Sequence, residues 1–388
     1  MIAEPAISPP AGRSAPQVPG GDAHIESGLE ANVIKYLGSK RTLVPMLGQM
    51  ATAVGASSAV DLFTGTTRVA QEFKRRSIDV TAVDVATYSE LLAKCFIEID
   101  ADSIDREALT AAFAELSSLR GEAGYFTETF CERSRFFHPK NGSRIDAIRS
   151  HLESTYRGSA LFPVLLTSLM LAADRVDSTT GVQMAYLKQW APRAHKDLEL
   201  RVPDLIAGKG VALRRDARDA ARGLPRVDLA YLDPPYNQHR YFTNYHVWET
   251  LVRWDQPEHY GVACKRLDAR DQDTKSDFNR KAAMPAALRD VIHAVDAATV
   301  VVSYNDESWV TPDLICSWLS EAGHECVDVI AVDSKRYVGA QIGIHNPRGE
   351  RVGEVKRLRN VEYLFVAGDR DRVGAAVTAA SEHHILTR

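Results

Sequence analysis

The sequence predicts an α/β fold in which a doubly wound, mostly parallel sheet of seven strands carries helices on both faces. Two observations predict the sheet. Short apolar, β-branched runs alternate with segments of helical periodicity, and several of these runs end in Gly, Asp or Pro. A third observation adds an insertion, because the alternation stops between residues 119 and 205 and then resumes. Two strand-like runs near the C-terminus are expected to pair as a terminal antiparallel hairpin.

The first βαβ unit is predicted near the N-terminus. SSAVDLF at 57–63 is an apolar run closed by Thr-Gly, which predicts a buried strand, and RVAQEFKRRS at 68–77 has helical spacing. SIDVTAVD at 77–84 is rich in β-branched residues and ends in an acid, which predicts a second strand. Residues 85–118 are expected to be helical. This order and spacing are those of a βαβ unit.

The stretch from 119 to 205 differs from the rest of the chain. It mixes aromatic and basic residues with one helical apolar block, LFPVLLTSLMLAAD at 161–174, so we interpret it as an inserted, mainly helical domain. The alternation then returns, with further strands predicted at 210–217, 227–233, 298–306, 324–337 and 360–368. The sheet domain is therefore expected to comprise residues 31–118 and 206–388.

Length, composition and charge exclude some classes of protein. The chain has 388 residues, which suggests two domains, and its 45% apolar and 25% charged content is ordinary for a globular protein. A net charge of −4 excludes a chain that is basic throughout. Between Cys131 and Val227, however, 17 Lys or Arg residues stand against 10 Asp or Glu. This excess suits a polyanion, and a solvated helical surface would give the same pattern.

The cysteines and the termini indicate the compartment. Five cysteines are scattered, without a Cys-x-x-Cys pair or a His cluster at metal-ligand spacing, so we expect reduced thiols, a cytoplasmic protein and no metal. No apolar run approaches the ~18 residues that cross a bilayer, and no membrane partner is expected. Residues 1–30 are rich in Pro, Gly, Ala and Ser, and we interpret them as a flexible tail rather than a signal peptide.

A nucleoside site is indicated where the first two strands end. Gly65 permits a tight turn that leaves the amide groups of the next helix exposed, and Asp84 ends the second strand. An acid about 20 residues after such a turn can bind ribose hydroxyls. The full Gly-x-Gly-x-x-Gly pattern is absent, so a nucleoside without phosphates fits better than a dinucleotide. A structural turn and a strand-end acid remain the alternative.

The stretch AYLDPPYNQHRYFTNYH at 230–246 ends a predicted strand in a rigid corner. Pro234 and Pro235 lack an N–H and have a fixed φ, so they cannot continue the sheet. The Asp233 carboxylate and the Pro234 carbonyl offer two acceptors, which suit an amino group with two N–H donors. The ring of Tyr236 suits stacking on a planar heterocycle. The corner therefore predicts a site for an exocyclic amine beside the nucleoside pocket.

These motifs resemble those of a known family. DPPY at 233–236 resembles the catalytic motif of amino-methyltransferases that use S-adenosylmethionine, and DLFTGTTRVA at 61–70 resembles their cofactor loop. KYLGSKR at 35–41 is similar to the N-terminal cofactor motif of the DNA adenine methylase family, and FTNYH at 242–246 to its following segment. The motif order resembles the subgroup whose target-recognition domain lies between the cofactor and catalytic motifs. The resemblance covers residues 32–367 and implies the methyltransferase sheet.

The resemblance implies a role for each matching residue of the cofactor motifs. Tyr36 and Lys40 would contact the cofactor, the tyrosine by packing and the lysine on or near the cofactor carboxylate. Phe63 and Gly65 would form the floor and the turn of the cofactor loop. Asp84 would bind the ribose hydroxyls.

At the corner, the resemblance implies that Asp233 and Pro234 hold the target amine where it faces the cofactor, and that Asp233 also contacts the cofactor. Pro235 completes the rigid catalytic motif, and Tyr236 would stack on the base. Asp216, at the end of the strand at 210–217, is positioned to reach the cofactor's adenine, although a surface acid would look the same.

One loop position departs from the family pattern. The family loop usually carries a second glycine two positions after Gly65, where this chain has Thr67. A side chain at this position is expected to narrow the approach to the methionine part of the cofactor. Affinity for the cofactor is therefore the least secure part of the resemblance.

The implied function is a site-specific DNA adenine-N6 methyltransferase that acts on an adenine flipped out of double-stranded DNA. It would be a restriction-modification enzyme, with a cognate restriction endonuclease as a partner, or an orphan methylase. The insert would read DNA, with 136–144 and 174–190 as candidate recognition loops. Tyr241, Phe242 and Tyr245 would contact the base or belong to the core.

Other functions stay open at this point. The same corner serves methylation of adenine in RNA or of cytosine N4, and an Asn variant of it serves protein glutamine. A catalytically inactive DNA-binding relic is a second class, supported by Thr67. A nicotinamide dehydrogenase is disfavoured because the pyrophosphate loop is incomplete.

Overall fold

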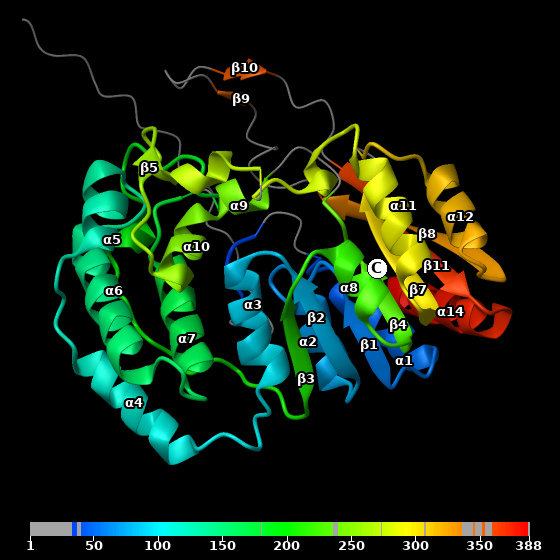
Figure 1. Ribbon diagram of the computed structural model, residues 1–388, viewed down its shortest axis with the longest axis horizontal. Coiled ribbons are helices and arrows are strands. Elements are labelled where there is room, and N and C mark those ends of the chain that lie inside the picture. The colour runs from blue at the N-terminus through cyan, green and yellow to red at the C-terminus, as the bar shows by residue number, and fades with distance from the viewer. Residues whose placement is uncertain are drawn as a thin grey trace, which may run out of the picture.

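The computed structural model describes residues 33–36, 40–179, 181–235, 240–272, 274–305, 308–335, 344–345, 351–353 and 359–386. Its centre is a seven-stranded sheet in the order β3-β2-β1-β4-β7-β11-β8 (Figure 1). The bounds of its strands are β1 Ser58–Asp61, β2 Asp79–Asp84, β3 Gly210–Arg214, β4 Val227–Leu232, β7 Ala297–Asn305, β8 Cys326–Lys335 and β11 Arg359–Gly368.

The direction of the strands confirms the predicted sheet. Strands β3, β2, β1, β4 and β7 pair in parallel, whereas β11 lies antiparallel between β7 and β8. Each of the seven strands falls on one of the predicted runs. The two C-terminal runs form an antiparallel pair, as expected, and the second of them is inserted next to β7.

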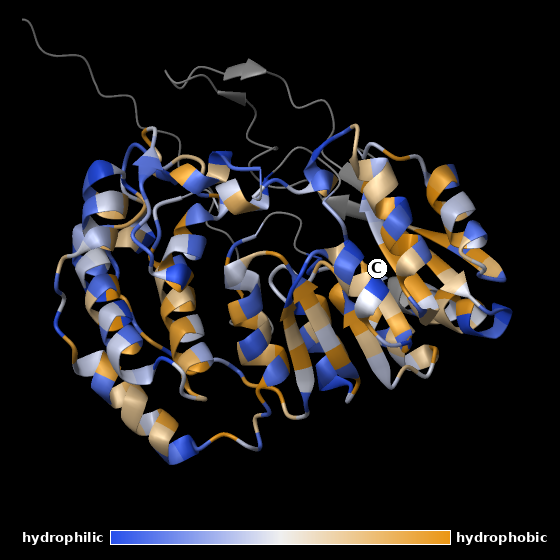
Figure 2. Cartoon of the chain, in the orientation of Figure 1, coloured by the Kyte–Doolittle hydropathy of each residue, from blue (hydrophilic) through white to orange (hydrophobic). Residues whose placement is uncertain are grey.

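Helices cover both faces of the sheet. Helices α1 Val44–Ala53, α2 Arg68–Arg75 and α14 Arg370–Leu386 contribute to one hydrophobic cluster, and α8 Ala217–Gly223, α11 Met284–Ala294 and α12 Pro312–Glu321 to a second. Because both faces are covered, a central strand such as β7 is buried along almost its whole length and reads as a continuous apolar run. Figure 2 shows the strands as the hydrophobic centre of this part of the molecule.

The stretch from 119 to 205, which we call the insert, is largely helical and stands beside the sheet (Figure 1). Its longest apolar helix, α7 Phe162–Arg175, is buried along most of its length and packs on α3 Thr87–Ala93 and on α10 His246–Arg253. Buried side chains of the insert belong to the same hydrophobic cluster as those of α1 and α2. The insert thus continues the core of one face of the sheet.

The remaining elements are short or connect these layers. They are η2 Lys94–Glu98, α4 Arg106–Ser118, α5 Tyr125–Thr127, η3 Glu128–Arg133, α6 Pro139–His151, η4 Leu152–Tyr156, η5 Pro192–His195, α9 Tyr241–Asn244, β5 His259–Tyr260, β6 Lys265–Arg266, η6 Leu267–Arg270, η7 Asp277–Asn279, β9 Ile344–His345 and β10 Arg351–Gly353. Of the elements that follow β4, α9 lies near the top of the view and α10 runs down beside α7 (Figure 1).

Candidate active site

A cavity of about 330 Å³ opens at the carboxyl ends of β1, β2 and β4. This is the edge of the sheet where ligands of open α/β folds bind. The described residues that the sequence predicted as catalytic or cofactor-binding all line this one cavity: Tyr36, Lys40, Phe63, Gly65, Asp84, Asp216, Asp233, Pro234 and Pro235. Tyr236 lies outside the described residues.

The turn after β1 is built around Gly65. Its φ of +51° is a left-handed conformation that glycine adopts without strain, and a Cβ there would lie 3.3 Å from the ring of Tyr36. The Gly65 N–H donates to Asp84 Oδ2 at 2.9 Å, and the Ala86 N–H donates to Asp84 Oδ1 at 2.9 Å. Burial raises the pKa of Asp84, and these backbone donors oppose the shift. Two backbone amides therefore hold this carboxylate at the wall of the cavity.

Thr67 occupies the position where the family pattern has a second glycine, and its backbone explains that preference. Its φ is +64°, a region that β-branched residues rarely enter. The side chain is fully buried, its Oγ1 accepts a hydrogen bond from Gln71 Nε2 at 2.9 Å, and Thr67 does not line the cavity. The prediction that Thr67 narrows the approach to the cofactor is therefore wrong.

The corner of Asp233, Pro234 and Pro235 follows the last residue of β4, as the prolines predict. Asp233 Oδ1 lies 3.1 Å from Lys40 Nζ, which is only 8% exposed. The same ammonium lies 2.5 Å from Glu362 Oε1 on β11. Burial raises the pKa of Asp233 to about 6, while Lys40 lowers it and Glu362 raises it further.

Glu362 is a buried residue of the site that sequence reasoning missed. Its carboxylate accepts hydrogen bonds from Ser303 Oγ at 2.9 Å and from Asn305 Nδ2 at 3.4 Å, both on the neighbouring strand β7. The signal was present, since an acid interrupts the apolar run NVEYLFVAG. A charge in a doubly covered strand needs a partner, but the sequence does not say which one.

A second carboxyl group, Asp61 at the end of β1, was also missed. It is buried, and burial raises its pKa to about 7, with the neighbouring Asp233 raising it further. The Phe63 N–H donates to its Oδ1 at 3.4 Å. The acid that opens DLFTGTT thus belongs to the electrostatic surroundings of the corner.

Stacked tyrosines join the N-terminal motif to the segment after the corner. The ring of Tyr36 lies nearly parallel to those of Tyr241 and Tyr245, with centroids at 5.2 Å and 4.7 Å. Its hydroxyl approaches that of Tyr88 to 3.4 Å. Tyr245 is buried core, whereas Tyr241 and Phe242 line the cavity. Of the three aromatic candidates for the base, two are therefore placed to meet a ligand.

A segment before α11 completes the cavity wall, and no motif predicted its place there. Its lining residues are Thr274, Lys275, Ser276, Phe278 and Asn279. The ring of Phe278 meets that of Phe63 edge-on at 4.9 Å.

An ion-pair chain connects this segment to the end of β3. Asp216 caps α8 by accepting a hydrogen bond from the Arg218 N–H, and Arg218 Nη1 lies 3.0 Å from Asp277 Oδ2. Asp216 is thus both a helix cap and a cavity residue, so its position does not require a ligand.

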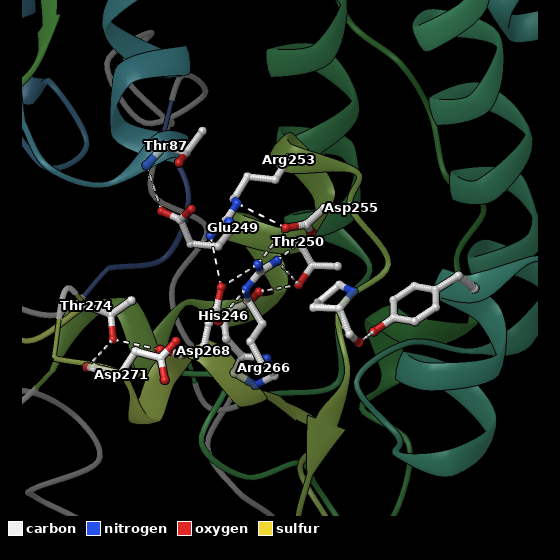
Figure 3. Close-up of polar contacts among 12 residues, drawn as sticks. Thr87, His246, Glu249, Thr250, Arg253, Asp255, Arg266, Asp268, Asp271 and Thr274 are labelled. Carbon is white, nitrogen blue, oxygen red and sulfur yellow. Dashed lines mark hydrogen bonds and ion pairs between the residues drawn. The ribbon is translucent and has the colours of Figure 1, made fainter.

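The segment after α10 is held by a buried arginine (Figure 3). The Arg266 guanidinium is 1% exposed and pairs in a bidentate manner with both Asp255 and Asp268, at 2.7–3.0 Å. On α10 itself, Glu249 accepts a hydrogen bond from the Thr87 N–H at 2.7 Å. That contact ties the helix after the corner to the helix that follows Asp84.

The two candidate recognition loops of the insert contain many structural residues. Phe136 and Phe137 are buried core. Gln183 is buried as well: its side-chain oxygen accepts from the Val247 N–H at 2.9 Å, and its carbonyl lies 2.9 Å from His246 Nε2. Burial lowers the pKa of His246 to about 3, so that this ring is neutral.

Lys35 also connects the N-terminal motif to the insert. Its ammonium lies 3.3 Å from Asp174 and 3.1 Å from Asp177, and Arg193 pairs with Asp177 as well. These carboxylates serve the packing of the insert. What the loops leave exposed includes Met184 and Lys188, with Arg135 over the ring of Trp190 at 4.7 Å.

The local excess of positive charge does not belong mainly to the insert. Within residues 119–205, 12 Lys or Arg stand against 10 Asp or Glu, so most of the excess lies in the stretch from 206 to 227, around β3 and α8. Several arginines of the insert are also engaged internally. Arg149, for example, is 1% exposed and donates to the carbonyl oxygens of Leu251 and Val252 at the end of α10.

Comparison with known proteins decides the family. The family model described as "D12 class N6 adenine-specific DNA methyltransferase" matches residues 36–313, which include the Gly65 turn, the insert and the corner. The chain belongs to this family. Its predicted resemblance to DNA adenine methylases is therefore confirmed.

Curated relatives carry related names. The chain is 28% identical over 323 residues to the modification methylase StsI of Streptococcus sanguinis, covering 78% of this chain and 49% of that protein. It is 30% identical over 311 residues to the type II methyltransferase M.FokI of Planomicrobium okeanokoites, covering 75% and 47%. The chain thus spans about half the length of these two relatives. It is 28% identical to the type II methyltransferase M.CviAII of Paramecium bursaria Chlorella virus 1, over 79% of this chain and 93% of that protein.

Two further observations concern membrane-spanning helices and metal sites. Among the helices of the described residues, none is both long enough and apolar enough to cross a membrane. In that same part of the chain, no group of three or more His, Cys, Asp or Glu side chains is arranged to hold a metal ion.

Proposed function

We propose that this chain is a site-specific DNA adenine-N6 methyltransferase that transfers a methyl group from S-adenosylmethionine to an adenine flipped out of double-stranded DNA. One observation carries the proposal: the corner at 233–235 and the loop of Gly65 and Asp84 line the same cavity, in a chain of this family. The loop side suits a nucleoside, and the corner suits an amine.

The cavity has the size and the polar groups that the cofactor needs. Its volume of about 330 Å³ falls within the usual range for small-molecule sites. The Asp84 carboxylate keeps acceptor capacity for ribose hydroxyls, since Oδ2 accepts from the Gly65 N–H and Oδ1 from the Ala86 N–H, while each oxygen has two lone pairs. When bound, S-adenosylmethionine supplies an electrophilic methyl group on a positively charged sulfonium.

The residues of the cavity wall would hold the cofactor. We assign Tyr36 and Phe63 to apolar packing, Gly65 to the turn, and Asp84 to the ribose. Lys40 is assigned to the cofactor carboxylate as well as to the corner, and Asp216 to the adenine, because both line the same cavity.

Asp233 and the Pro234 carbonyl would act on the target amine. The amino nitrogen of adenine is a poor nucleophile because its lone pair is delocalised into the ring. Two acceptors on its hydrogens raise the electron density at nitrogen and fix its orientation. With a pKa of about 6, Asp233 is ionised at neutral pH and can take the proton that the nitrogen loses. Pro235 keeps the corner rigid, and Tyr236 would stack on the base.

The insert is the part we assign to DNA recognition, as a domain of residues 119–205 within a methyltransferase domain of 31–118 and 206–388 after a tail of 1–30. Its exposed residues near Trp190, with Arg135 over the ring, suit a nucleic-acid surface. The basic stretch around β3 and α8 is the second candidate for phosphate contacts. Relatives named modification methylases favour a restriction-modification role with a cognate endonuclease.

The experiment that tests this function offers labelled S-adenosylmethionine together with unmethylated genomic DNA, total RNA and denatured protein in separate reactions. The label should enter DNA, and nucleoside analysis should find N6-methyladenine. Label at cytosine N4 or in RNA would support the proposed chemistry of the corner but contradict the proposed substrate. No transfer and no cofactor binding would favour the inactive relic, which loses its sequence support now that Thr67 lies outside the cavity wall.

A further inference from the structure

Three charged side chains from distant parts of the sequence meet behind the corner. Lys40 precedes α1, Asp233 follows β4, and Glu362 lies on β11, two strands away from β4. The Lys40 ammonium lies between the two carboxylates, 3.1 Å from Asp233 Oδ1 and 2.5 Å from Glu362 Oε1. All three side chains are at most 18% exposed, so water screens their interactions poorly.

The sheet fixes Glu362 more firmly than the lysine. Glu362 pairs with Asn305 across the β11–β7 ladder and accepts hydrogen bonds from Ser303 and Asn305. Lys40, in contrast, has a long side chain and stands outside the regular elements. The rigid carboxylate therefore determines where the flexible ammonium sits. A single positive charge is shared between Glu362 and the carboxylate of the corner.

We propose that Glu362 is a positioning residue that holds the Lys40 ammonium between two carboxylates and so keeps Asp233 only partly neutralised. A carboxylate fully paired with an ammonium is a weaker hydrogen-bond acceptor toward a third group. Because Glu362 draws Lys40 toward itself, Asp233 remains a stronger hydrogen-bond acceptor for the target amine. This inference rests on the proposed role of Asp233 in methyl transfer.

Other titratable groups also face Asp233. Asp61 at the end of β1 interacts with it electrostatically, as does Tyr231 on β4, whose pKa burial raises well above the usual range. The ion pairs of Lys40 described above are with Asp233 and Glu362. Changing Glu362 should therefore act on Asp233 mainly through the shared ammonium and through the lost negative charge.

The direct test measures the titration of Asp233 by carbon NMR of the protein labelled at aspartate carboxyl carbons, with Asp233→Asn assigning the signal. Glu362→Gln keeps the shape of the side chain and removes its charge. The pKa of Asp233 should fall by about one unit, because Lys40 then faces one carboxylate instead of two. Glu362→Asp, which keeps the charge, should stay closer to the wild type. Glu325→Gln, at an exposed acid just before β8, is the matched control and should leave the titration unchanged.

The pH profile of the methyl-transfer rate gives the second readout. In Glu362→Gln the acid limb should move to lower pH with the Asp233 titration, and the rate on the plateau should fall by about threefold to tenfold. A purely structural role predicts a lower melting temperature and a lower rate at every pH, with the limb and the titration unmoved. That result would overturn the proposal. So would a rise in the pKa of Asp233, which would mean that Lys40 had left it.

A second pair of variants covers the case in which Glu362→Gln does not fold. Lys40→Met should raise the pKa of Asp233, and the double variant Lys40→Met with Glu362→Gln removes both charges of the buried pair. Its Asp233 pKa should lie below that of Lys40→Met alone, and equal values would contradict the account. Since the NMR titration requires no activity, it still tests the role of Glu362 if the wild type transfers no methyl group, a result that would refute the proposed function alone.

Discussion

Two half-buried aspartates stand at the ends of strands on either side of β1, and they are held in different ways. Asp84 closes β2 and is fixed by the backbone N–H groups of Gly65 and Ala86. Asp233 follows β4 and faces the side chain of Lys40, which Glu362 shares. Backbone donors hold a carboxylate in a fixed position. A shared ammonium instead sets how far the charge of the carboxylate is neutralised. The first arrangement suits binding, and the second suits chemistry.

The largest expected effect comes from the second aspartate. Asp233→Asn keeps the size of the side chain but removes the charge that accepts from the amine. We expect methyl transfer to fall by at least about 100-fold, because general-base and electrostatic groups contribute that much or more. Cofactor affinity, measured by titration calorimetry, should change little. Asp328→Asn, at an exposed position on β8, is the control and should leave both quantities unchanged.

The first aspartate should show the opposite pattern. In Asp84→Asn one of the two backbone donors loses its acceptor, and the ribose loses a charged partner. We expect cofactor affinity to fall by about tenfold or more, in line with hydrogen bonds to a charged group. The transfer rate at saturating cofactor should stay within a few-fold of wild type. If affinity were unchanged, the assignment of Asp84 to the cofactor would be wrong.

The pH dependence separates activity from stability at the corner. The carboxyl of Asp233, with a pKa of about 6, must be ionised to act, so the transfer rate should fall as the pH drops below 6. A stopped-assay profile between pH 5 and 8 measures this limb. In Asp61→Asn the limb should stay in place, because Asp61, with a pKa of about 7, is already mostly neutral over the range in which Asp233 titrates.

Stability should respond to pH in the opposite direction. The folded pKa values of Asp61, about 7, and Asp233, about 6, lie above the ordinary value of 3.8. Between these limits the folded protein binds more protons than the unfolded chain, so the contribution of these groups to stability falls as the pH rises from 4 to 7. Melting temperatures should therefore decrease less over this range in Asp61→Asn than in wild type. An identical slope would show that Asp61 is not held with a raised pKa.

The smallest expected effects concern the loop beside Asp84. Gly65→Ala places a Cβ against the ring of Tyr36 in a left-handed backbone, and cofactor affinity should fall.

Thr67→Gly should change the free energy of unfolding little. The variant relieves a strained φ worth about 1–2 kcal/mol. It also loses the hydrogen bond to Gln71 and makes the unfolded chain more flexible, so the two effects nearly cancel. Thermal unfolding should shift by only a few degrees, and affinity should stay unchanged. A clear gain in affinity would revive the idea that Thr67 obstructs the site.

The sequence predicted the Asp84 side of the site better than the Asp233 side, for a physical reason. Gly65 and Asp84 act through a turn and a strand end, and the spacing of neighbouring residues in the sequence predicts both features. The prolines likewise predict where β4 ends. The partner of Lys40 on β11 could not be predicted, because it depends on which strand lies next to β7. For the same reason Phe278 and the rest of the segment before α11 were missed.

The insert shows the same limit. Its helical character followed from the apolar block that became α7, but the roles of its polar residues did not. Gln183 and Asp177 look like recognition residues in a polar loop, yet they hold α10 and Lys35. Only tertiary contacts separate a side chain that stabilises a loop from one that the loop presents to a partner.

The most direct test of the difference between the two aspartates is a single-turnover measurement from a preformed enzyme–cofactor complex, in which DNA is added last. Because the cofactor is already bound, Asp84→Asn should transfer its methyl group at a rate within a few-fold of wild type. Asp233→Asn should remain at least about 100-fold slower. Equal losses in the two variants would contradict the account, since they would mean that both carboxylates serve the same step.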